Sequence, residues 1–290
     1  MNNAEYRVIE HKSDKFIIER GGETVEVTAR GKLKRDGEIL VGDFVMLDEG
    51  AERPVIAKVL PRKNSLVRPA VANIDLVVAV VAPVPETDGF LIDKLLINCK
   101  NAGIDCLICL NKSDVAKDEK DRLLSEYGAD ACGVAVTTAI SGDASELKPY
   151  LNGKVVCFAG QSAVGKSTLS NVILGDNSRV VGELSERIGR GKNTTTSARL
   201  LRSPDGFYFV DTPGFSVLDA VGVKSDELAL YYEEYVGLAD GCKFHPCTHT
   251  SEPGCAVKAA VDCGKLNRDR YERYVKIYGE LKEAEKRRTK

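Results

Sequence analysis

The sequence has 290 residues, with 41 Lys plus Arg against 43 Asp plus Glu and 43% hydrophobic residues. This composition excludes a fibrous or wholly disordered chain, and the length favours two or three domains, of which we expect three. No apolar run reaches the roughly 18 residues that span a bilayer, and the N-terminal stretch is polar. We therefore expect a cytoplasmic protein with no membrane partner. Most of the nine cysteines stand in apolar stretches, which indicates reduced thiols.

The first 68 residues are predicted to form a small β-barrel. Short alternating segments at 16–19, 24–28, 44–47 and 55–60 are separated by glycine-containing turns. An oligonucleotide-binding (OB) barrel suits this size and the basic loops, but periodicity alone does not distinguish it from other small barrels. Because the net charge is only −2, any nucleic-acid surface must be local.

The middle of the chain is typical of an α/β domain. Continuous apolar runs at 76–82, 106–110, 155–159 and 207–210 alternate with helical patterns at 90–101 and 167–174, which predicts a parallel sheet covered by helices. Beyond it, 226–238 is expected to be helical, a Cys/His cluster follows, and 268–286 is predicted to be a closing helix. The expected domains are 1–69, 70–220 and 221–290.

A phosphate-binding motif follows the run 155–159. The segment 160–167 fits G-x-x-x-x-G-K-[ST] and opens a predicted helix. In such a loop, backbone N–H groups surround phosphate oxygens, Lys166 contacts the β and γ phosphates, and the Ser167 hydroxyl binds Mg²⁺. We expect nucleotide contacts from Gly160, Gln161, Ser162, Ala163, Val164, Gly165, Lys166, Ser167 and Thr168.

The base is predicted to be guanine. Residues 111–114 read Asn-Lys-Ser-Asp, directly after the run 106–110. The Asp114 carboxylate can accept hydrogen bonds from N1–H and the 2-amino group of guanine, which adenine does not offer. In isolation these four residues could also be a turn with a helix N-cap. Asn111 and Lys112 complete the motif, and Thr138 and Ala139 are a candidate accessory guanine loop.

Two candidate switch segments complete the nucleotide chemistry. Asp211, at the end of the run 207–210, is expected to hold the Mg²⁺ water shell, and the N–H of Gly214 to sense a γ phosphate. Thr195 lies in the Thr-rich stretch 189–196 and is expected to join Ser167 and Asp211 around Mg²⁺ in the GTP state, although such a stretch could be an ordinary linker. The expected cofactors are GTP or GDP and Mg²⁺, with Lys166 and Thr195 as candidate catalytic residues.

The order of these motifs differs from that of Ras-like GTPases. The guanine motif precedes the phosphate loop, whereas the usual order is phosphate loop, switches and then guanine motifs. The sequence therefore predicts a circularly permuted GTPase domain, with both flanking domains attached close to the second switch.

A third group of residues has metal-ligand spacing. Cys242, Cys247, His249 and Cys255 form C-x₄-C-x-H-x₅-C, and three thiolates with one imidazole fill a tetrahedral Zn²⁺ shell. With no open position, the site is expected to be structural, with one zinc ion per chain. His245 and Cys263 are nearby alternatives, and Cys263 is expected instead to be a buried apolar residue.

The sequence resembles the RsgA (YjeQ) family of circularly permuted, small-subunit-dependent GTPases over essentially its whole length. The resemblance is carried by 62–69 (RKNSLVRP), 73–75 (NID), the permuted motifs and 252–257 (EPGCAV). It implies an α/β P-loop GTPase domain between an N-terminal OB barrel and a C-terminal zinc-binding helical domain. It also implies a GTPase that binds the small (30S) ribosomal subunit and its rRNA late in assembly and is stimulated by that subunit.

One position departs from the family pattern. The family usually carries His in the switch sequence G-R-G-[KR]-H-T-T, where it is a proposed catalytic residue, and Asn193 stands there in this chain. An asparagine can orient a water but cannot take up a proton near neutral pH. Phe215 follows the DTPG motif, where Ras-like enzymes place a water-orienting Gln. Asn193 is thus a candidate catalytic residue only because it occupies the position of the family's His.

The leading hypothesis is a monomeric, Mg²⁺-dependent GTPase checkpoint on the small subunit. The alternative is a GTP-stabilised rRNA-binding module in which hydrolysis is not essential, using phosphate contacts that weaken with salt. An unrelated P-loop kinase is disfavoured because the guanine motif and the switches are already explained.

Overall fold

The computed structural model describes residues 5–31, 33, 38–48, 50, 54–67, 69–116, 118–175, 198–211 and 222–288. The chain divides into two compact units, each made from separate stretches of sequence. The first comprises Met1–Leu76, Lys148–Phe158 and Ser167–Phe215, and the second comprises Val77–Leu147, Ala159–Lys166 and Ser216–Lys290. Among the described residues, no helix is long and apolar enough to cross a bilayer.

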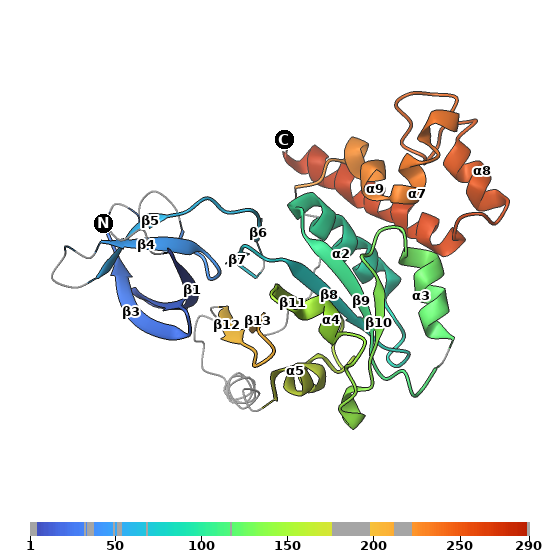
Figure 1. The fold of residues 1–290 in the computed structure, drawn as a ribbon. Helices are drawn as coiled ribbons and strands as arrows, with labels where there is room; N and C mark the ends of the chain where they lie inside the picture. Colours follow the sequence, from blue (N-terminus) through green and yellow to red (C-terminus); the bar gives the residue numbers. More distant parts are fainter. Residues whose placement is uncertain are drawn as a thin grey trace. The chain divides into compact units, whose positions relative to one another are not determined.

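A five-stranded β-barrel opens the first unit (Figure 1). Its strands are β1 (Glu5–Lys12), β2 (Lys15–Arg20), β3 (Glu23–Ala29), β4 (Phe44–Asp48) and β5 (Val55–Val59). They pair in the order β1-β2-β3-β5-β4, and β4 returns to β1, which closes the barrel. Val8, Ile18, Val45 and Ile56 are fully buried inside it. This confirms the predicted barrel.

The same unit holds a second group of strands. β11 (Val155–Ala159) runs parallel to β13 (Tyr208–Asp211), and β12 (Arg199–Arg202) is antiparallel to β13. The helices α4 (Lys148–Leu151) and α5 (Lys166–Leu174) and the short pair β6 (Ser65–Leu66) and β7 (Val71–Ala72) complete it. β12 also pairs with β1, so the barrel continues into this sheet.

The second unit begins with three strands in the order β10-β9-β8 (Figure 1). β8 (Leu76–Val81), β9 (Asp105–Leu110) and β10 (Val134–Val136) alternate with α2 (Gly89–Ala102) and α3 (Glu119–Tyr127). β9 and β10 are parallel, and every residue of β8 is buried. This alternation of buried strands and helices is the α/β architecture that the continuous apolar runs predicted. The carboxyl ends of the three strands therefore carry the loops of the candidate site.

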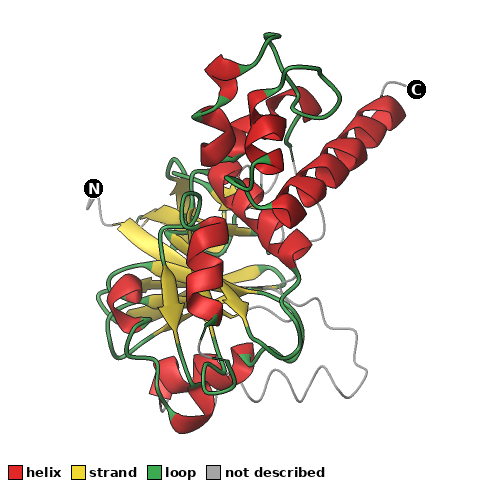
Figure 2. Ribbon diagram, turned by 90° about the vertical axis from the view of Figure 1, so that its right-hand side faces the viewer, coloured by secondary structure: helices red, strands yellow, loops and turns green. Residues whose placement is uncertain are grey.

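The C-terminal part of this unit is helical. It contains η3 (Ser225–Tyr231), α7 (Glu233–Val236), η4 (Ala239–Gly241), α8 (Ala256–Asp262) and the long α9 (Arg268–Arg288), which ends near the C-terminus in Figure 2. The stretch 226–238, expected to be helical, forms two short helical elements, because Tyr232 is extended (φ −115°, ψ 104°) and separates η3 from α7. The buried Tyr232 ring stacks on Tyr235 and meets Tyr274 edge-on, so core packing overrides the helical pattern.

A buried ion network ties α9 to the α/β part of the second unit. The Arg270 guanidinium contacts Asp93 Oδ1 at 3.2 Å and Asp130 Oδ2 at 2.6 Å, and it donates to the Glu126 carbonyl at 2.6 Å. Arg273 pairs with Oδ2 of Asp93. Because Asp93 and Arg270 are buried, neither charge is stable in the protein interior without its partner. α9 is thus held on α2 and α3 by charges as well as by apolar packing.

Candidate nucleotide and metal sites

The phosphate loop leaves the end of β11 in a conformation that only glycine permits at two positions. Gly160 has φ +140°, and a Cβ there would lie 2.2 Å from the Val80 carbonyl oxygen. Gly165 has φ +95°, and a Cβ there would lie 2.4 Å from Asn111 Nδ2. Both substitutions would collide with groups that are held in place. The loop therefore lies directly against β8 and the guanine motif.

Lys166 begins α5 and folds its side chain back over the loop. Nζ donates hydrogen bonds to the carbonyls of Gly160, at 2.7 Å, and Gln161. Burial lowers the pKa of Lys166, because the charged ammonium loses part of its hydration. The ammonium is therefore held inside the loop where the motif predicts phosphate contacts.

Asn111 joins three loops at the carboxyl ends of the strands. Its Nδ2 donates to the Val164 carbonyl at 2.9 Å, and its Oδ1 accepts from the Ala139 N–H at 3.0 Å and from Thr137 Oγ1 at 3.1 Å. The side chain is buried, so each of these bonds replaces water that it cannot reach. The guanine motif, the accessory loop and the phosphate loop are consequently one connected structure.

The neighbours of Asn111 strengthen this connection. Lys112 Nζ donates to the carbonyls of Val84 and Ala163, both at 2.7 Å, and the hydroxyls of Ser113 and Thr138 lie 2.9 Å apart. Asp114 is exposed in the turn that follows β9. Its carboxylate is therefore accessible at the edge of the site, as a base-reading group must be.

Backbone strain is concentrated at these motifs. Among the described residues, five other than glycine have positive φ, and Lys112 (+57°), Ala163 (+65°) and His249 (+57°) belong to the three predicted sites. Such conformations cost free energy and persist where the surrounding contacts impose them. The strain thus coincides with the positions to which the sequence assigns chemistry.

Ser167, Thr168 and Asp211 belong to the first unit. Ser167 and Thr168 are exposed in the first turn of α5, and Asp211 ends β13. Burial raises the pKa of Asp211, and the charge of Arg199 lowers it. Oδ2 of Asp211 is buried and has no hydrogen-bond partner among the described residues. A buried carboxylate oxygen without a partner is costly, and a cation or its water shell would satisfy it.

Three predicted site residues lie outside the described residues. These are Asn193, Thr195 and Gly214. The remaining residues of the phosphate loop, Ser162 and Ala163, are exposed, whereas Val164 is buried beneath it.

One contact of the phosphate loop was not expected from the sequence. The backbone N–H of Asp88, the N-cap residue of α2, donates to Oε1 of Gln161 at 3.0 Å. The Asp88 carboxylate itself accepts from the N–H groups of Phe90 and Leu91. Helix α2 thus starts against the phosphate loop. The Asp88 cap was readable as a helix start, but its contact with a residue 73 positions away was not.

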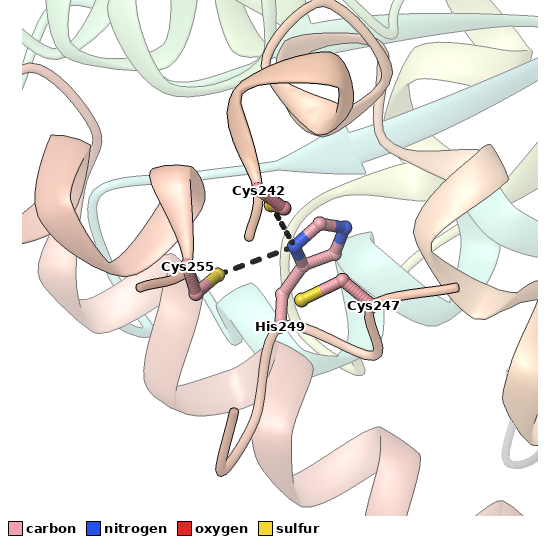
Figure 3. A group of neighbouring side chains, drawn as sticks. All are labelled: Cys242, Cys247, His249 and Cys255. Atoms are coloured by element: carbon pink, nitrogen blue, oxygen red, sulfur yellow. Dashed lines mark hydrogen bonds between the residues drawn. The ribbon is translucent and has the colours of Figure 1, made fainter. Parts of the chain in front are cut away.

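The four predicted zinc ligands converge in the second unit (Figure 3). The ligand atoms of Cys242, Cys247, His249 and Cys255 all lie within 4.8 Å of one another. Nδ1 of His249 is 3.6 Å from Cys242 Sγ and 3.3 Å from Cys255 Sγ. A tetrahedral zinc site with the usual bond lengths separates its ligand atoms by about 3.5 to 3.8 Å. The arrangement therefore fits zinc, with Nδ1 as the histidine ligand.

The surroundings of this cluster act differently on its histidine and its thiols. Burial lowers the pKa of His249, which favours the neutral imidazole that binds a metal. Burial raises the pKa of the Cys247 thiol to about 12, so in the absence of a cation this side chain is protonated and must release its proton when a metal binds. The Ala256 N–H points at Cys242 Sγ at 3.4 Å, and Tyr271 Oη donates to the His249 carbonyl at 2.9 Å. These contacts orient the ligands from outside, as second partners do in zinc sites.

The two alternative ligands are not part of the cluster. His245 is exposed, and the metal-binding group found among the described residues does not include Cys263. The expectation that Cys263 is buried is wrong. It lies exposed at the end of α8, where its Sγ donates to the Ala260 carbonyl.

The fold and these two sites define a P-loop GTPase with permuted motifs, an N-terminal β-barrel and a C-terminal Cys₃His cluster. The model of the RsgA GTPase family matches residues 59–221. The chain belongs to the RsgA GTPase family and is a GTP hydrolase.

Curated relatives match nearly the whole chain. The small ribosomal subunit biogenesis GTPase RsgA of Caldanaerobacter subterraneus subsp. tengcongensis is 41% identical over 277 residues, which cover 94% of this chain and 93% of that protein. The protein of the same name from Thermotoga maritima is 39% identical over 270 residues, covering 91% of each.

Two solved structures share the fold. YjeQ from Thermotoga maritima has a TM-score of 0.79 and 35% identity, covering 96% of this chain and 98% of that one. YloQ, described as a circularly permuted GTPase, has a TM-score of 0.78 and 26% identity, covering 97% and 95%. The permuted order predicted from the motifs is therefore confirmed.

Proposed function

We propose that this GTPase acts in the maturation of the small ribosomal subunit, binding the 30S particle and its rRNA and hydrolysing GTP there. The curated relatives are named small ribosomal subunit biogenesis GTPases. The observation that carries the nucleotide part is the 2.9 Å hydrogen bond from Asn111 Nδ2 to the Val164 carbonyl. It supports one pocket built from the guanine motif and the phosphate loop.

Each predicted nucleotide-binding residue has a proposed task. Asp114 reads the guanine edge, with Asn111 and Lys112 holding its loop and Thr138 and Ala139 completing the base site. Gly160 to Thr168 surround the phosphates, and Lys166 stabilises the negative charge that develops during phosphoryl transfer. Thr195 and Gly214 are proposed to respond to the γ phosphate.

Mg²⁺ is proposed to be held by Ser167, Thr195 and Asp211. The buried, unpartnered Oδ2 of Asp211 supports a cation near that carboxylate, and Ser167 is exposed at the start of α5. The ion, when bound, would neutralise charge on the β and γ phosphates. Asp211 would orient it and Ser167 would supply a hydroxyl ligand.

Zinc is proposed to be structural, with one ion per chain. Three thiolates and one imidazole leave no position for a reactant. Its role would be to hold together the segment 237–266, whose helices are too short to build a core of their own.

We further propose a division of labour among three domains: an OB barrel at 1–69, the permuted GTPase domain at 70–220 and the zinc domain at 221–290. The barrel supports an rRNA contact because five-stranded barrels of this kind bind oligonucleotides. The zinc domain would supply a second rRNA contact at the basic end of α9, where Lys282, Lys286 and Arg287 are close in sequence.

The test is GTP turnover measured with the protein alone, with purified small subunits and with large subunits as the control. We expect slow turnover that only small subunits stimulate, and that Lys166→Ala abolishes the stimulation. Lys148→Ala, an exposed lysine paired with Asp205, is the matched control and should behave as wild type. Equal turnover with and without small subunits would contradict the proposal.

The same assay tests Asn193. Because asparagine cannot accept a proton near neutral pH, we expect Asn193→His to raise the stimulated rate and Asn193→Ala to lower it. Unchanged rates in both variants would remove Asn193 from the catalytic residues.

A further inference from the structure

Arg199 lies directly opposite Asp211 on neighbouring strands of the first unit. β12 and β13 are antiparallel, and their register pairs Arg199 with Asp211. Residues opposed in this way project from the same face of the sheet, with Cβ atoms about 4.5 to 5.5 Å apart. The guanidinium is therefore a close positive charge for this carboxylate, and its charge acts on Asp211.

Arg199 also faces the barrel. The register of β1 and β12 pairs it with Glu10, and Arg199 Nε lies 3.3 Å from Glu10 Oε2. Nε is nevertheless buried without a hydrogen-bond partner among the described residues, so this ion pair is close but not well aligned. Lys12 Nζ lies 3.6 Å from the same Glu10 oxygen.

One guanidinium thus stands between two carboxylates that belong to different parts of the unit. Glu10 is on the barrel strand β1, and Asp211 ends the sheet strand β13. Arg199 Nε and Asp211 Oδ2 are both buried and lack a hydrogen-bond partner among the described residues. Because a buried polar atom without a hydrogen bond is costly, a change of partner at this guanidinium can lower the free energy.

We propose that Arg199 is a positioning residue shared by Glu10 and Asp211, and that it couples the β1–β12 contact of the barrel to Mg²⁺ binding at Asp211. This inference rests on the proposed metal role of Asp211. A divalent cation at Asp211 repels the guanidinium, which then turns fully to Glu10 and tightens the pairing of β1 with β12. By thermodynamic reciprocity, the attraction of Glu10 for Arg199 strengthens Mg²⁺ binding.

The coupling makes two single substitutions act in opposite directions. Without the Glu10 charge, Arg199 stays at Asp211 and competes with the cation, so Glu10→Gln should weaken Mg²⁺ binding about fivefold, at the lower end of measured couplings. Arg199→Gln removes the competitor and should strengthen Mg²⁺ binding. Arg199→Lys keeps the charge and should remain close to wild type in its folding.

A double-mutant cycle distinguishes an effect of Glu10 that passes through Arg199 from a direct electrostatic effect of the Glu10 charge on the metal. The probe is fluorescent GDP, whose dissociation rate is followed while Mg²⁺ is titrated, which gives the half-saturating Mg²⁺ concentration. If Arg199 carries the effect, Glu10→Gln should change this value less than about twofold in the Arg199→Gln background. Glu26→Gln removes a carboxylate that pairs with Lys15 elsewhere on the barrel, and it should leave the value unchanged.

A second readout follows the barrel strand itself. Addition of Mg²⁺ to the GDP complex should slow amide hydrogen exchange across residues 5–12 in wild type, but not in Arg199→Gln. An equal effect of Glu10→Gln with and without Arg199, or Mg²⁺-independent exchange at β1, would overturn the coupling. If instead Mg²⁺ does not slow GDP release in wild type, or Asp211→Asn leaves its half-saturation unchanged, the proposed metal role of Asp211 fails and the coupling fails with it.

Discussion

Asn111 Nδ2 donates a hydrogen bond of 2.9 Å to the carbonyl of Val164, although the two residues are 53 positions apart. This bond joins the guanine motif to the phosphate loop, and Gly165 makes room for it by having no Cβ. In a permuted chain these loops have exchanged their order along the sequence. Their contact nevertheless brings the two motifs together at the ends of β8 and β9.

We predict that Asn111→Ala weakens GDP binding tenfold or more. The substitution leaves the Val164 carbonyl and the Ala139 N–H without their partner, and each buried unsatisfied group costs about 1–3 kcal/mol. Isothermal titration with GDP measures the effect. Asn152→Ala, which removes an exposed asparagine, is the control. GDP affinity equal in the two variants would show that the loop contact does not support the site.

We predict that Arg270→Met destabilises the protein by about 3–5 kcal/mol, because it leaves Asp93 and Asp130 buried without their cation. Arg268→Met is the matched control on the same helix. Arg268 pairs with Asp262 in solvent, and exposed pairs contribute about 0–1 kcal/mol. Urea unfolding curves give both values. Similar midpoints for the two variants would contradict a structural role for the buried network.

We predict that part of the acid sensitivity of folding comes from Glu285. Hydrogen bonds from the N–H and Oγ of Ser225, at 2.7 and 2.8 Å, lower the pKa of Glu285 below its ordinary 4.5. A carboxyl whose folded pKa is lowered stabilises the fold above the unfolded pKa, and this stability is lost as pH falls through the folded value. Thermal midpoints measured below pH 5 should therefore fall less steeply in Glu285→Gln than in wild type.

Glu283→Gln is the control for that measurement. It removes a carboxylate from the same helix, paired with Arg287, without touching Ser225. If both variants flatten the pH dependence equally, the Ser225 contact is not its cause.

We predict about one zinc ion per chain by metal analysis, and none after Cys247→Ala. Binding releases protons from the thiols, so the zinc affinity should rise with pH. The variant should become sensitive to proteolysis in the segment 237–266 while it still binds GDP. Cys263→Ala, which changes an exposed cysteine outside the cluster, should keep its metal. A variant of Cys247 with full zinc content would contradict the assigned ligand set.

The features predicted correctly are those written in local sequence. Gly160 and Gly165 are visible from the spacing of one short motif, although the contacts that require them are with the distant Val80 and Asn111. The clustered residues Cys242 to Cys255 lie within 14 residues, so their spacing also reveals them. β8 and β9 are buried throughout most of their length and show as apolar runs. In each case the recognisable pattern is contained in one segment.

The features that were missed depend on distant partners. The strand β1 exposes or half-exposes every residue except Val8, so it carries no visible alternation. Arg270 and Asp93 are 177 residues apart, and neither stands in a motif. The same holds for Arg199, whose opposition to Asp211 follows only from strand register. Such pairs are set by tertiary packing, which single-sequence periodicity does not report.

The central claim is that the loops joined by Asn111 form a pocket selective for guanine nucleotides. Competition against fluorescent GDP, with unlabelled GDP and ADP as competitors, tests it most directly. Because the Asp114 carboxylate is proposed to accept hydrogen bonds from groups that adenine lacks, we expect ADP to bind at least about 1,000-fold more weakly than GDP, and Asp114→Ala to abolish most of that difference. ADP that displaces the probe within about tenfold of the GDP concentration would contradict the account.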